Sequence, residues 1–388
     1  MSDPIGNEDN EELDAIPDEG LTEEDIRQKF EEASNEIGRF NLAIFGQTGV
    51  GKGTLINALF GKEVAETGMG RPVTQEGHLY VHETERFGLY DTRGLEISDD
   101  PELLLDEFAQ YLDETRDKPL SDQIHLAYYC VNVHSTRLQH QEDNFIQGLR
   151  QLGLPVILVV TKCDNSEAGE LREDLQIIVN AIEAEAIEAD LDIFDKKAFP
   201  ICSLKSTYST QYGLAELLDA TFRAAPEGVE AALSAAQVLD RDRKSDKAQT
   251  DIAFACTAAG VAAFTPIPFA DAPILAGIQL AMMGRISAAY GISVSTSTQA
   301  AVVASGAATA VGKSLVGGLI KLIPGLGTVA GGVINSAVAT SLTLAMGQTW
   351  NKICQMDFDG EIDLEKIANH ELVKIFKDLL KRWWSSDN

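Results

Sequence analysis

Short apolar runs alternate with longer amphipathic stretches between residues 40 and 224 of the chain. The apolar runs are rich in β-branched and aromatic side chains and predict strands, whereas the stretches between them show helical spacing of apolar residues. Such alternation is typical of an α/β domain with a mostly parallel sheet and helices on both faces. The predicted strands are 40–45, 78–82, 87–90, 124–133, 156–160 and 198–201, and the predicted helices are 51–60, 101–111, 141–152, 167–188 and 214–224.

The second half of the chain has a different pattern. No side chain is charged from Ile252 to Ala270, and none from Leu322 to Asn351. Small residues dominate both stretches, and prolines and glycines interrupt them, so each predicts a helical hairpin with a tight bend. Small residues also let helices approach closely, and Gly327 and Gly331 form a G-x-x-x-G match. We therefore predict an all-α hydrophobic domain.

The remaining segments complete the predicted domain organisation. Residues 1–21 are acidic and predict a disordered tail, and they lack the basic start and apolar core of a signal peptide. A capping-box pattern at Thr22 to Asp25 opens a predicted helix over 22–38, which we expect to pack on or near the following domain. The α/β domain then spans 39–224, a charged linker or helix spans 225–247, and the hydrophobic helical domain spans 248–388.

The last segment of the chain predicts an amphipathic helix. Apolar residues from Leu364 to Trp383 recur at helical spacing, with lysines and an arginine among them and Trp383-Trp384 at the end. Such a helix can lie at a lipid headgroup boundary. The same stripe can instead pack against the helical domain, and both interpretations stay open.

Charge and cysteine content narrow the class of protein. The formal net charge is −29, which disfavours nucleic acid as a general partner because phosphate binding needs a basic surface. The cysteines form no close pairs and predict small buried side chains in a reducing cytosol. They are Cys130, Cys163, Cys202, Cys256 and Cys354.

A glycine-rich loop joins the first predicted strand to the first predicted helix of the α/β domain. Residues 46–52 read G-Q-T-G-V-G-K, a phosphate-binding pattern. Backbone N–H groups and a helix N-terminus attract an anion, and Lys52 adds a mobile cation. The predicted nucleotide contacts of this loop are Gly46, Gln47, Thr48, Gly49, Val50, Gly51, Lys52, Gly53 and Thr54.

Two further motifs predict recognition of a guanine base. The strand 156–160 ends in Thr161-Lys162-Cys163-Asp164, a T/N-K-x-D pattern. The Asp164 carboxylate can accept two hydrogen bonds from guanine N1 and N2, which adenine cannot offer, while the Lys162 stem can lie over the base. Ser203 and Leu204 follow the last strand and resemble the weaker S-A-K base loop. GTP or GDP is therefore the predicted ligand.

The strand 87–90 ends in Asp91-Thr92-Arg93-Gly94, a D-x-x-G pattern. A carboxylate at a strand tip can hold the shell of a magnesium ion, and the N–H of Gly94 can touch a γ-phosphate. This pattern is common by itself. Its position between the phosphate loop and the base motifs gives it weight.

Together these motifs resemble the translation-factor-related GTPases, particularly the Era-like and immunity-related branch, and the broad plan resembles that of dynamin-like GTPases. The resemblance covers about residues 40–223 and implies a P-loop GTPase fold. It also implies that Thr74, which lies where switch I carries a threonine, binds Mg²⁺ together with Asp91. Residues 251–350 resemble an uncharacterised hydrophobic helical domain found beside bacterial Era-like GTPases, which suggests membrane association.

Two positions depart from the family pattern. Gly53 stands where a Ser or Thr hydroxyl binds magnesium, and Thr54 comes one residue, or about 100° of helix rotation, later. We therefore predict weakened Mg²⁺ binding and slow turnover. Leu95 stands where small signalling GTPases place a water-orienting glutamine, so no catalytic base can be named. Thr74 and Arg93 are the only candidates for a catalytic role.

The sequence favours a slow GTPase switch that couples nucleotide state to membrane association, remodelling or self-assembly as a nucleotide-dependent homodimer or oligomer. The alternative is a nucleotide-binding scaffold with little hydrolysis, and Asp164 argues against an ATPase. Three interpretations of the helical half stay open: a soluble bundle, membrane-inserting hairpins, and a domain that meets a bilayer reversibly. We expect a cytoplasmic protein that is peripheral to, or inserted in, the cytoplasmic membrane if it meets lipid.

Overall fold

The computed structural model describes residues 23–61, 71–72, 79–82, 84–90, 101–135, 137–164, 170–205, 210–263, 271–297, 300 and 336–386. A seven-stranded sheet in the order β2-β3-β4-β1-β5-β6-β7 forms the centre of an α/β domain. The five strands from β4 to β7 in that order pair in parallel, and β3 and β2 add an antiparallel edge. The strands are β1 (Phe40–Phe45), β2 (Arg71–Pro72), β3 (Leu79–Val81), β4 (Phe87–Tyr90), β5 (Leu126–Asn132), β6 (Val156–Thr161) and β7 (Ala198–Pro200).

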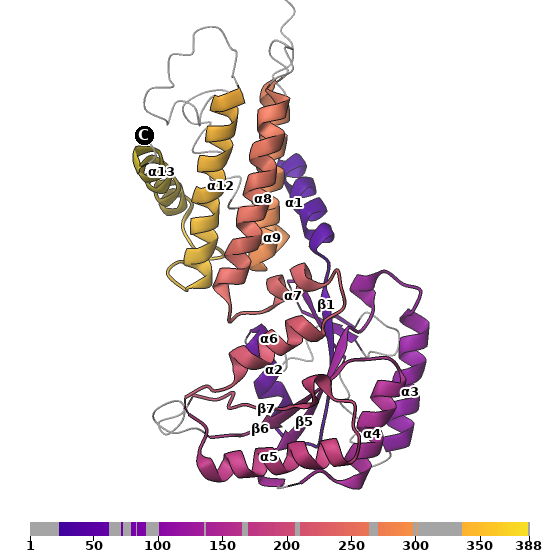
Figure 1. Ribbon diagram of the computed structural model, residues 1–388. Coiled ribbons are helices and arrows are strands. Elements are labelled where there is room, and N and C mark those ends of the chain that lie inside the picture. Colours follow the sequence, from indigo (N-terminus) through magenta and orange to yellow (C-terminus); the bar gives the residue numbers. More distant parts are fainter. Residues whose placement is uncertain are drawn as a thin grey trace, which may run out of the picture.

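Helices cover both faces of this sheet, which confirms the predicted fold class (Figure 1). Neighbouring residues of a strand point to opposite faces, so Leu42 and Ile44 of β1 join one core while Ala43 and Phe45 join the other. The first core holds α2 (Lys52–Phe60), α6 (Leu214–Ala224) and α7 (Glu230–Ala236). The second holds α3 (Pro101–Thr115), α4 (His140–Gln151) and α5 (Glu173–Glu188). Short 3₁₀ turns lie at Leu120–Asp122, Val133–Ser135 and Phe194–Lys196.

A second, all-helical region lies at one end of the α/β domain (Figure 1). Its helices are α8 (Arg241–Ala262), α9 (Asp271–Tyr290), α12 (Ser336–Phe358) and α13 (Asn369–Ser386). Trp350 is fully buried there, and its indole N–H donates to Ser287 Oγ at 2.9 Å. At Gly347 a Cβ would lie 2.7 Å from Ile252 and 2.9 Å from Met282, so α12 approaches α8 and α9 closely because this residue has no side chain.

The N-terminal helix α1 (Glu23–Ile37) bridges the two regions. It packs mainly on α9, where Gly284 lets the helices touch at Ala33. Its other end reaches the α/β domain, because the guanidinium of Arg86 donates to Ser34 O at 2.5 Å and to Gly38 O at 3.1 Å. Burial among carbonyl groups lowers the pKa of Arg86 to about 10. The expectation that this helix packs on or near the α/β domain therefore holds for one end only.

The structure corrects the start of one predicted helix and decides between two interpretations of another. The helix predicted over 167–188 begins at Glu173 instead, after residues 170–172 in a non-helical arrangement. The amphipathic C-terminal helix is α13, and its stripe of Leu372, Phe376 and Leu380 is buried in the helical core. The structure therefore favours the packed interpretation of that stripe over the lipid-facing one.

The described part of the helical region contains no helix long and apolar enough to cross a bilayer. The predicted bends at 264–270 and 323–327, and the G-x-x-x-G match at Gly327 and Gly331, lie outside the described residues.

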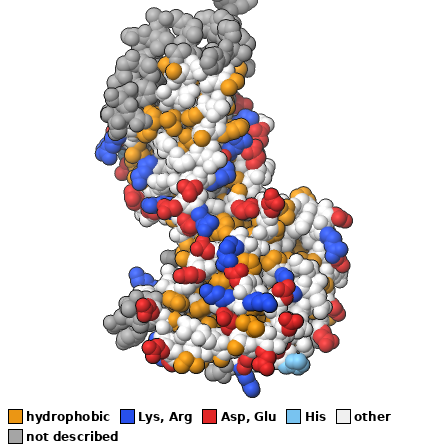
Figure 2. Space-filling model, viewed as in Figure 1, with side chains coloured by type: hydrophobic (Ala, Val, Ile, Leu, Met, Phe, Trp, Pro, Cys, Tyr) orange, Lys and Arg blue, Asp and Glu red, His pale blue; other side chains and the backbone are white. Residues whose placement is uncertain are grey.

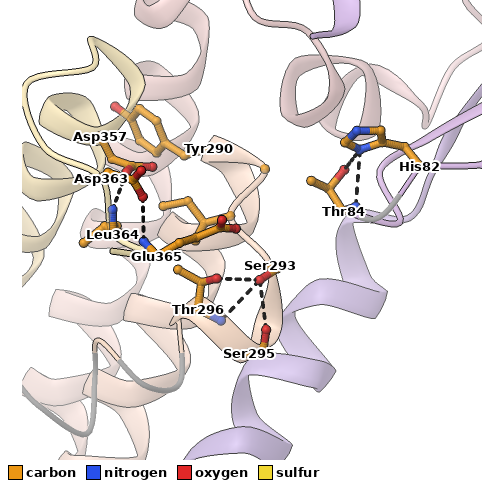
Figure 3. Close-up of a pocket in the computed structure, with 12 residues that line it drawn as sticks. His82, Thr84, Tyr290, Ser293, Ser295, Thr296, Asp357, Asp363, Leu364 and Glu365 are labelled. Carbon is orange, nitrogen blue, oxygen red and sulfur yellow. Dashed lines mark hydrogen bonds between the residues drawn. The ribbon is translucent and has the colours of Figure 1, made fainter. Parts of the chain in front are cut away.

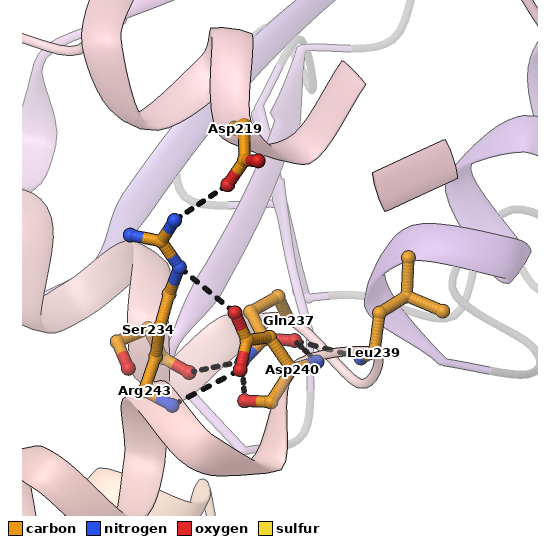
Figure 4. A network of polar contacts seen from close by, with 6 residues as sticks. All are labelled: Asp219, Ser234, Gln237, Leu239, Asp240 and Arg243. Carbon is orange, nitrogen blue, oxygen red and sulfur yellow. Dashed lines mark hydrogen bonds and ion pairs between the residues drawn. The ribbon is translucent and has the colours of Figure 1, made fainter. Parts of the chain in front are cut away.

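The charged run at 240–247 forms the start of α8 and the junction between the two regions. Asp240 caps this helix by accepting a hydrogen bond from the N–H of Arg243 at 3.0 Å. The Arg243 guanidinium bridges Asp240 and Asp219 of α6 (Figure 4). It also lies over the ring of Phe222. We call Asp219, Phe222, Asp240 and Arg243 the junction network. It joins the first helix of the helical region to the last helix before α7.

Lys244 is buried at the same junction, although it lies in a densely charged run whose other residues are at least partly exposed. Its side chain is 1% exposed, and its Nζ donates to Ala235 O at 2.8 Å and Ala289 O at 3.4 Å. These carbonyls lie near the C-terminal ends of α7 and α9. Burial lowers the pKa of Lys244 to about 7, a shift that Asp240 partly offsets. One amine thus ties three helices together.

Candidate functional site

The predicted phosphate loop connects β1 to α2 at the carboxyl end of the sheet. Gly46 has a φ of 131°, and a Cβ there would lie 2.3 Å from Cys130 O on β5. Gly51, the N-cap of α2, has a φ of 109°, in the left-handed region. Both positions therefore require glycine for steric reasons, and the loop is held tightly against β5.

Lys52 lies folded back across the loop. Its Nζ donates to Gly46 O at 2.7 Å and to Gln47 O at 3.1 Å. The turn is closed by a bond from Val50 N to Gln47 O at 3.3 Å. The ammonium group therefore lies at the mouth of the loop, where it can exchange these carbonyl contacts for an anion.

Thr161 joins the phosphate loop to the predicted base motif. Its hydroxyl donates to Val50 O at 2.6 Å and lies 3.1 Å from Val131 O of the neighbouring strand β5. The side chain is buried. The first residue of T-K-x-D is thus fixed against the loop that should hold phosphate, so the two motifs lie next to each other at the same sheet edge.

The following residues turn sharply so that buried and exposed side chains alternate. Lys162 has a φ of 59°, Cys163 is buried with its N–H donating to Ile201 O at 3.0 Å, and Asp164 is exposed. The Cys163 contact ties the motif to the end of β7. Lys162 and Asp164 are left facing solvent, as contact with a ligand requires.

Backbone hydrogen bonds join the two ends of the second predicted base loop. Cys202 and Tyr212 exchange two hydrogen bonds of 3.0 Å, and Ser203 and Leu204 follow directly. Gly213, with a φ of 72°, then packs so closely on Pro200 O that a Cβ would lie 2.0 Å away. The loop therefore leaves β7 and enters α6 through a fixed junction.

The buried thiols near the site stay protonated. Burial raises the pKa of both Cys130 and Cys163 to about 12. The five cysteines form no disulfide, and four are buried, in agreement with the sequence prediction. Cys130 is fully enclosed on β5 and serves packing there.

One neighbour of the phosphate loop was missed by the sequence analysis. Glu142 is buried at the start of α4, where its carboxylate accepts from Gln139 N at 2.9 Å and from the Gln47 amide at 3.4 Å. Burial raises the pKa of Glu142. The Gln139-to-Glu142 spacing is that of a capping box and could have located the helix start. It could not have shown the contact with Gln47.

The predicted metal and switch residues lie outside the described residues. They are Thr74, Asp91, Arg93, Gly94 and Leu95. Gly53 is the second residue of α2 and supplies no hydroxyl, so this position does not fit the usual magnesium ligand. Within the described ranges, no group of three His, Cys, Asp or Glu side chains could hold a metal ion.

Two adjoining cavities lie away from the phosphate loop, at the junction of the two regions. The larger, of about 610 Å³, separates His82 and Thr84 of the β3–β4 turn from acidic residues near the end of α12 and the segment that follows it (Figure 3). The smaller, of about 410 Å³, shares Thr84, Ser293 and Ser295 with it and extends to α1. The side-chain carboxylate of Asp357 accepts a hydrogen bond from Leu364 N at 2.8 Å. Burial raises the pKa of this group.

The loop, the T-K-x-D turn and their shared sheet edge agree with a comparison to known proteins. Residues 41–162 match the family model described as 50S ribosome-binding GTPase. This chain carries a GTPase domain. The match extends from β1 to the second residue of T-K-x-D, and the GTPase family implies binding of a guanine nucleotide, typically with Mg²⁺.

Known GTPases are similar to part of this chain, over part of their own length. GTPase Der of Trichormus variabilis is 31% identical over 138 residues, which are 34% of this chain and 28% of that protein. GTPase Der of Persephonella marina is 27% identical over 209 residues, 53% of this chain and 40% of that protein. GTPase Era of Cronobacter sakazakii is 29% identical over 141 residues, 35% of this chain and 44% of that protein.

The chain thus spans less than half the length of these curated relatives. The Era-like part of the sequence resemblance is confirmed for the GTPase domain. Its immunity-related and dynamin-like parts stay predictions.

Proposed function

We propose that this protein is a guanine-nucleotide switch that hydrolyses GTP slowly and passes its nucleotide state to the helical region. The contact between Thr161 Oγ1 and Val50 O carries the proposal, because it brings the phosphate loop and the base motif into one site. Phosphates would lie on the backbone N–H groups of residues 46–54 beside Lys52. Asp164 would accept from the guanine edge, Lys162 would cover the base, and the Leu204 N–H would donate to guanine O6.

Direct binding is the first test. Purified protein should bind GDP and GTP and should bind ADP and ATP much more weakly. Equal affinity for the adenine nucleotides would contradict the assignment of the base pocket. Single-turnover hydrolysis of GTP then separates the switch from the alternative, a scaffold that binds nucleotide without hydrolysing it. The missing hydroxyl at Gly53 is the observation that favours the scaffold.

Replacing Gly53 with serine is expected to tighten Mg²⁺ binding, because it supplies a hydroxyl where the family pattern places one. The Mg²⁺ concentration that half-saturates the effect on GTP affinity should fall by roughly 10-fold. The backbone of Gly53 is helical, a conformation that serine adopts without backbone strain. Titration of magnesium at fixed GTP measures the effect.

Gly53→Ala is the matched control for this substitution. Like serine, alanine raises the helix propensity of this position, and more strongly, but it has no hydroxyl. Only the serine variant should therefore gain metal dependence, whatever each substitution does to stability. Identical magnesium curves for both would show that position 53 does not face the metal.

Three contacts support coupling between the nucleotide site and the helical region. The junction network joins α6, which starts at the second base loop, to α8. Val238 N donates to Leu59 O at 2.9 Å, which joins the helix after the phosphate loop to the segment before α8. Ala288 and Ala289 of α9 belong to the same core as β1 and α2. Movement at either end of the site would therefore reach the helical region.

Lipid attachment is the output that the described helices support best. On α8, Phe254 and Val261 are 63% and 67% exposed, and Ile274 of α9 is 50% exposed. In Figure 2 uncharged side chains gather in the upper part of the helical region, while charged ones are frequent at the junction and over the GTPase domain. We infer peripheral binding of a cytoplasmic protein to a membrane surface, with self-association of the GTPase domains as a second output.

Flotation with liposomes of neutral phospholipid tests both the output and its coupling. We expect more protein to float with a GTP analogue than with GDP. Arg243→Ala should reduce the difference between the two nucleotides several-fold, because it removes both ion pairs and the ring contact of the junction network.

Arg223→Ala is the control for this arm. Arg223 pairs with Asp195 and lies over Phe194, so it makes the same kind of contact inside the GTPase domain. Its loss should leave the nucleotide difference unchanged. If the unmodified protein floats equally with GDP and with the GTP analogue, the proposed coupling to lipid is contradicted. The proposal that the protein binds guanine nucleotide would not be affected.

A further inference from the structure

Two side-chain donors hold the second base loop of the GTPase domain. The Gln211 amide donates to Ser203 O at 3.0 Å, and the Cys202 thiol donates to Leu204 O at 3.3 Å. Among the described residues no strand pairing reaches these two carbonyls, since the Cys202–Tyr212 bridge lies one step before the loop. The two side chains therefore help to fix the loop conformation at Ser203 and Leu204.

The hydrogen bond from Gln211 has a directional consequence. No described peptide bond is cis. The C=O of Ser203 and the N–H of Leu204 therefore lie in one peptide plane and point in opposite directions. A donor fixed on the carbonyl side therefore fixes the direction of the N–H on the other side. The Cys202 thiol does the same for the next plane, through Leu204 O.

The orientation of a backbone N–H in this loop matters for the choice of purine. Guanine presents an acceptor at O6, whereas adenine presents an amino group at the same position. A rigid N–H donor forms a hydrogen bond with guanine O6 but faces the amino group of adenine without a partner. An unpaired polar group in a binding site lowers affinity. A donor free to rotate would discriminate less.

We propose that Gln211 is a positioning residue for guanine specificity: it holds the Ser203–Leu204 peptide so that the Leu204 N–H faces the purine. This rests on the proposed function. Gln211 itself is exposed and belongs to none of the recognised motifs. It acts through the loop, and its own contact with nucleotide is not required.

Gln211→Ala should weaken GDP binding by roughly 3- to 10-fold, the value of one hydrogen bond, while ADP binding is unchanged. Gln211→Glu should weaken GDP binding at least as much, because a carboxylate has the same reach but can only accept and would face the Ser203 carbonyl. Fluorescence titration of the full chain with GDP and with ADP gives the ratio of affinities for each variant.

Gln176→Ala is the matched control. Gln176 is an exposed amide on α5 that donates to Asn180 at 2.8 Å, away from the base loop. It should keep the ratio of the unmodified protein. The melting temperature of each variant shows that the domain remains folded.

The outcomes distinguish failure of the positioning role of Gln211 from failure of the proposed nucleotide-binding function. A loss of GDP selectivity in both Gln211 variants but not in Gln176→Ala supports the positioning role. Equal losses for GDP and ADP would show a general structural role and overturn it, as would an unchanged ratio in both variants. An unmodified protein that binds no guanine nucleotide would overturn the proposed function itself.

Discussion

Replacing Asp164 with alanine is expected to lower GDP affinity by about 100-fold or more. Asp164 is exposed at the end of a turn whose other residues are fixed by the Thr161 hydroxyl and the Cys163 N–H, so its carboxylate is held ready for a ligand. Two hydrogen bonds to a charged acceptor contribute about 3–6 kcal/mol together, which corresponds to roughly 10²- to 10⁴-fold in affinity. Isothermal titration with GDP measures the loss.

Asp164→Asn gives a sharper form of the same experiment. An amide can donate to the C2 oxygen of xanthine and accept from its N1–H, so affinity should move from GDP toward xanthosine diphosphate. Asp113→Asn is a control, since Asp113 is an exposed carboxylate on α3 paired with Arg116 at 2.8 Å. A variant with unchanged GDP affinity, or without a gain for xanthine, would show that Asp164 does not contact the base.

Replacing Lys244 with methionine is expected to remove a pH dependence of stability. The folded pKa is about 7 and the ordinary value is 10.5, so between these values the unfolded chain binds more protons at this group than the folded one. The group's contribution to the free energy of unfolding therefore rises with pH across that window, by about 1.4 kcal/mol per unit at most, and is constant below it. Methionine has a similar length and does not titrate.

The difference between the two proteins isolates this contribution. Urea unfolding at pH 6, 7, 8 and 9 should show the unmodified protein gaining on Lys244→Met by on the order of 2 kcal/mol from the lowest to the highest pH. Lys247→Met is the matched control, because Lys247 lies one turn along α8 and forms a part-exposed ion pair with Asp251 at 2.7 Å. A flat difference for Lys244→Met would mean that its amine reaches water.

The sequence predicted the fold class and the position of the site because both depend on local patterns. A buried strand followed by G-Q-T-G-V-G-K fixes a loop and a helix start, and the structure places that loop beside T-K-x-D. The steric reason for Gly46 was not predictable, since it is the carbonyl of Cys130, 84 residues away in sequence, that fills the space of a side chain. The roles of the individual site residues stay predictions.

Lys244 shows where local reasoning fails. The run Asp240 to Lys247 contains alternating charges and predicts a solvated helix or linker. Helical geometry turns one of these side chains toward α7 and α9, and only tertiary packing decides which one. Gln211 and Glu142 were missed for the same reason, because each acts through a contact with a residue that no local pattern connects to it.

The position of α7 has a practical consequence for work with the isolated GTPase domain. Ala232, Leu233, Ala235 and Ala236 cover the same face of the sheet as α2 and α6. A shortened chain that stops at Ala224, where α6 ends, would expose that apolar face to solvent. Such a fragment would be prone to aggregate. A fragment intended for crystallisation should extend at least through Gln237, whose side chain caps the turn after α7 by accepting from Leu239 N and Asp240 N.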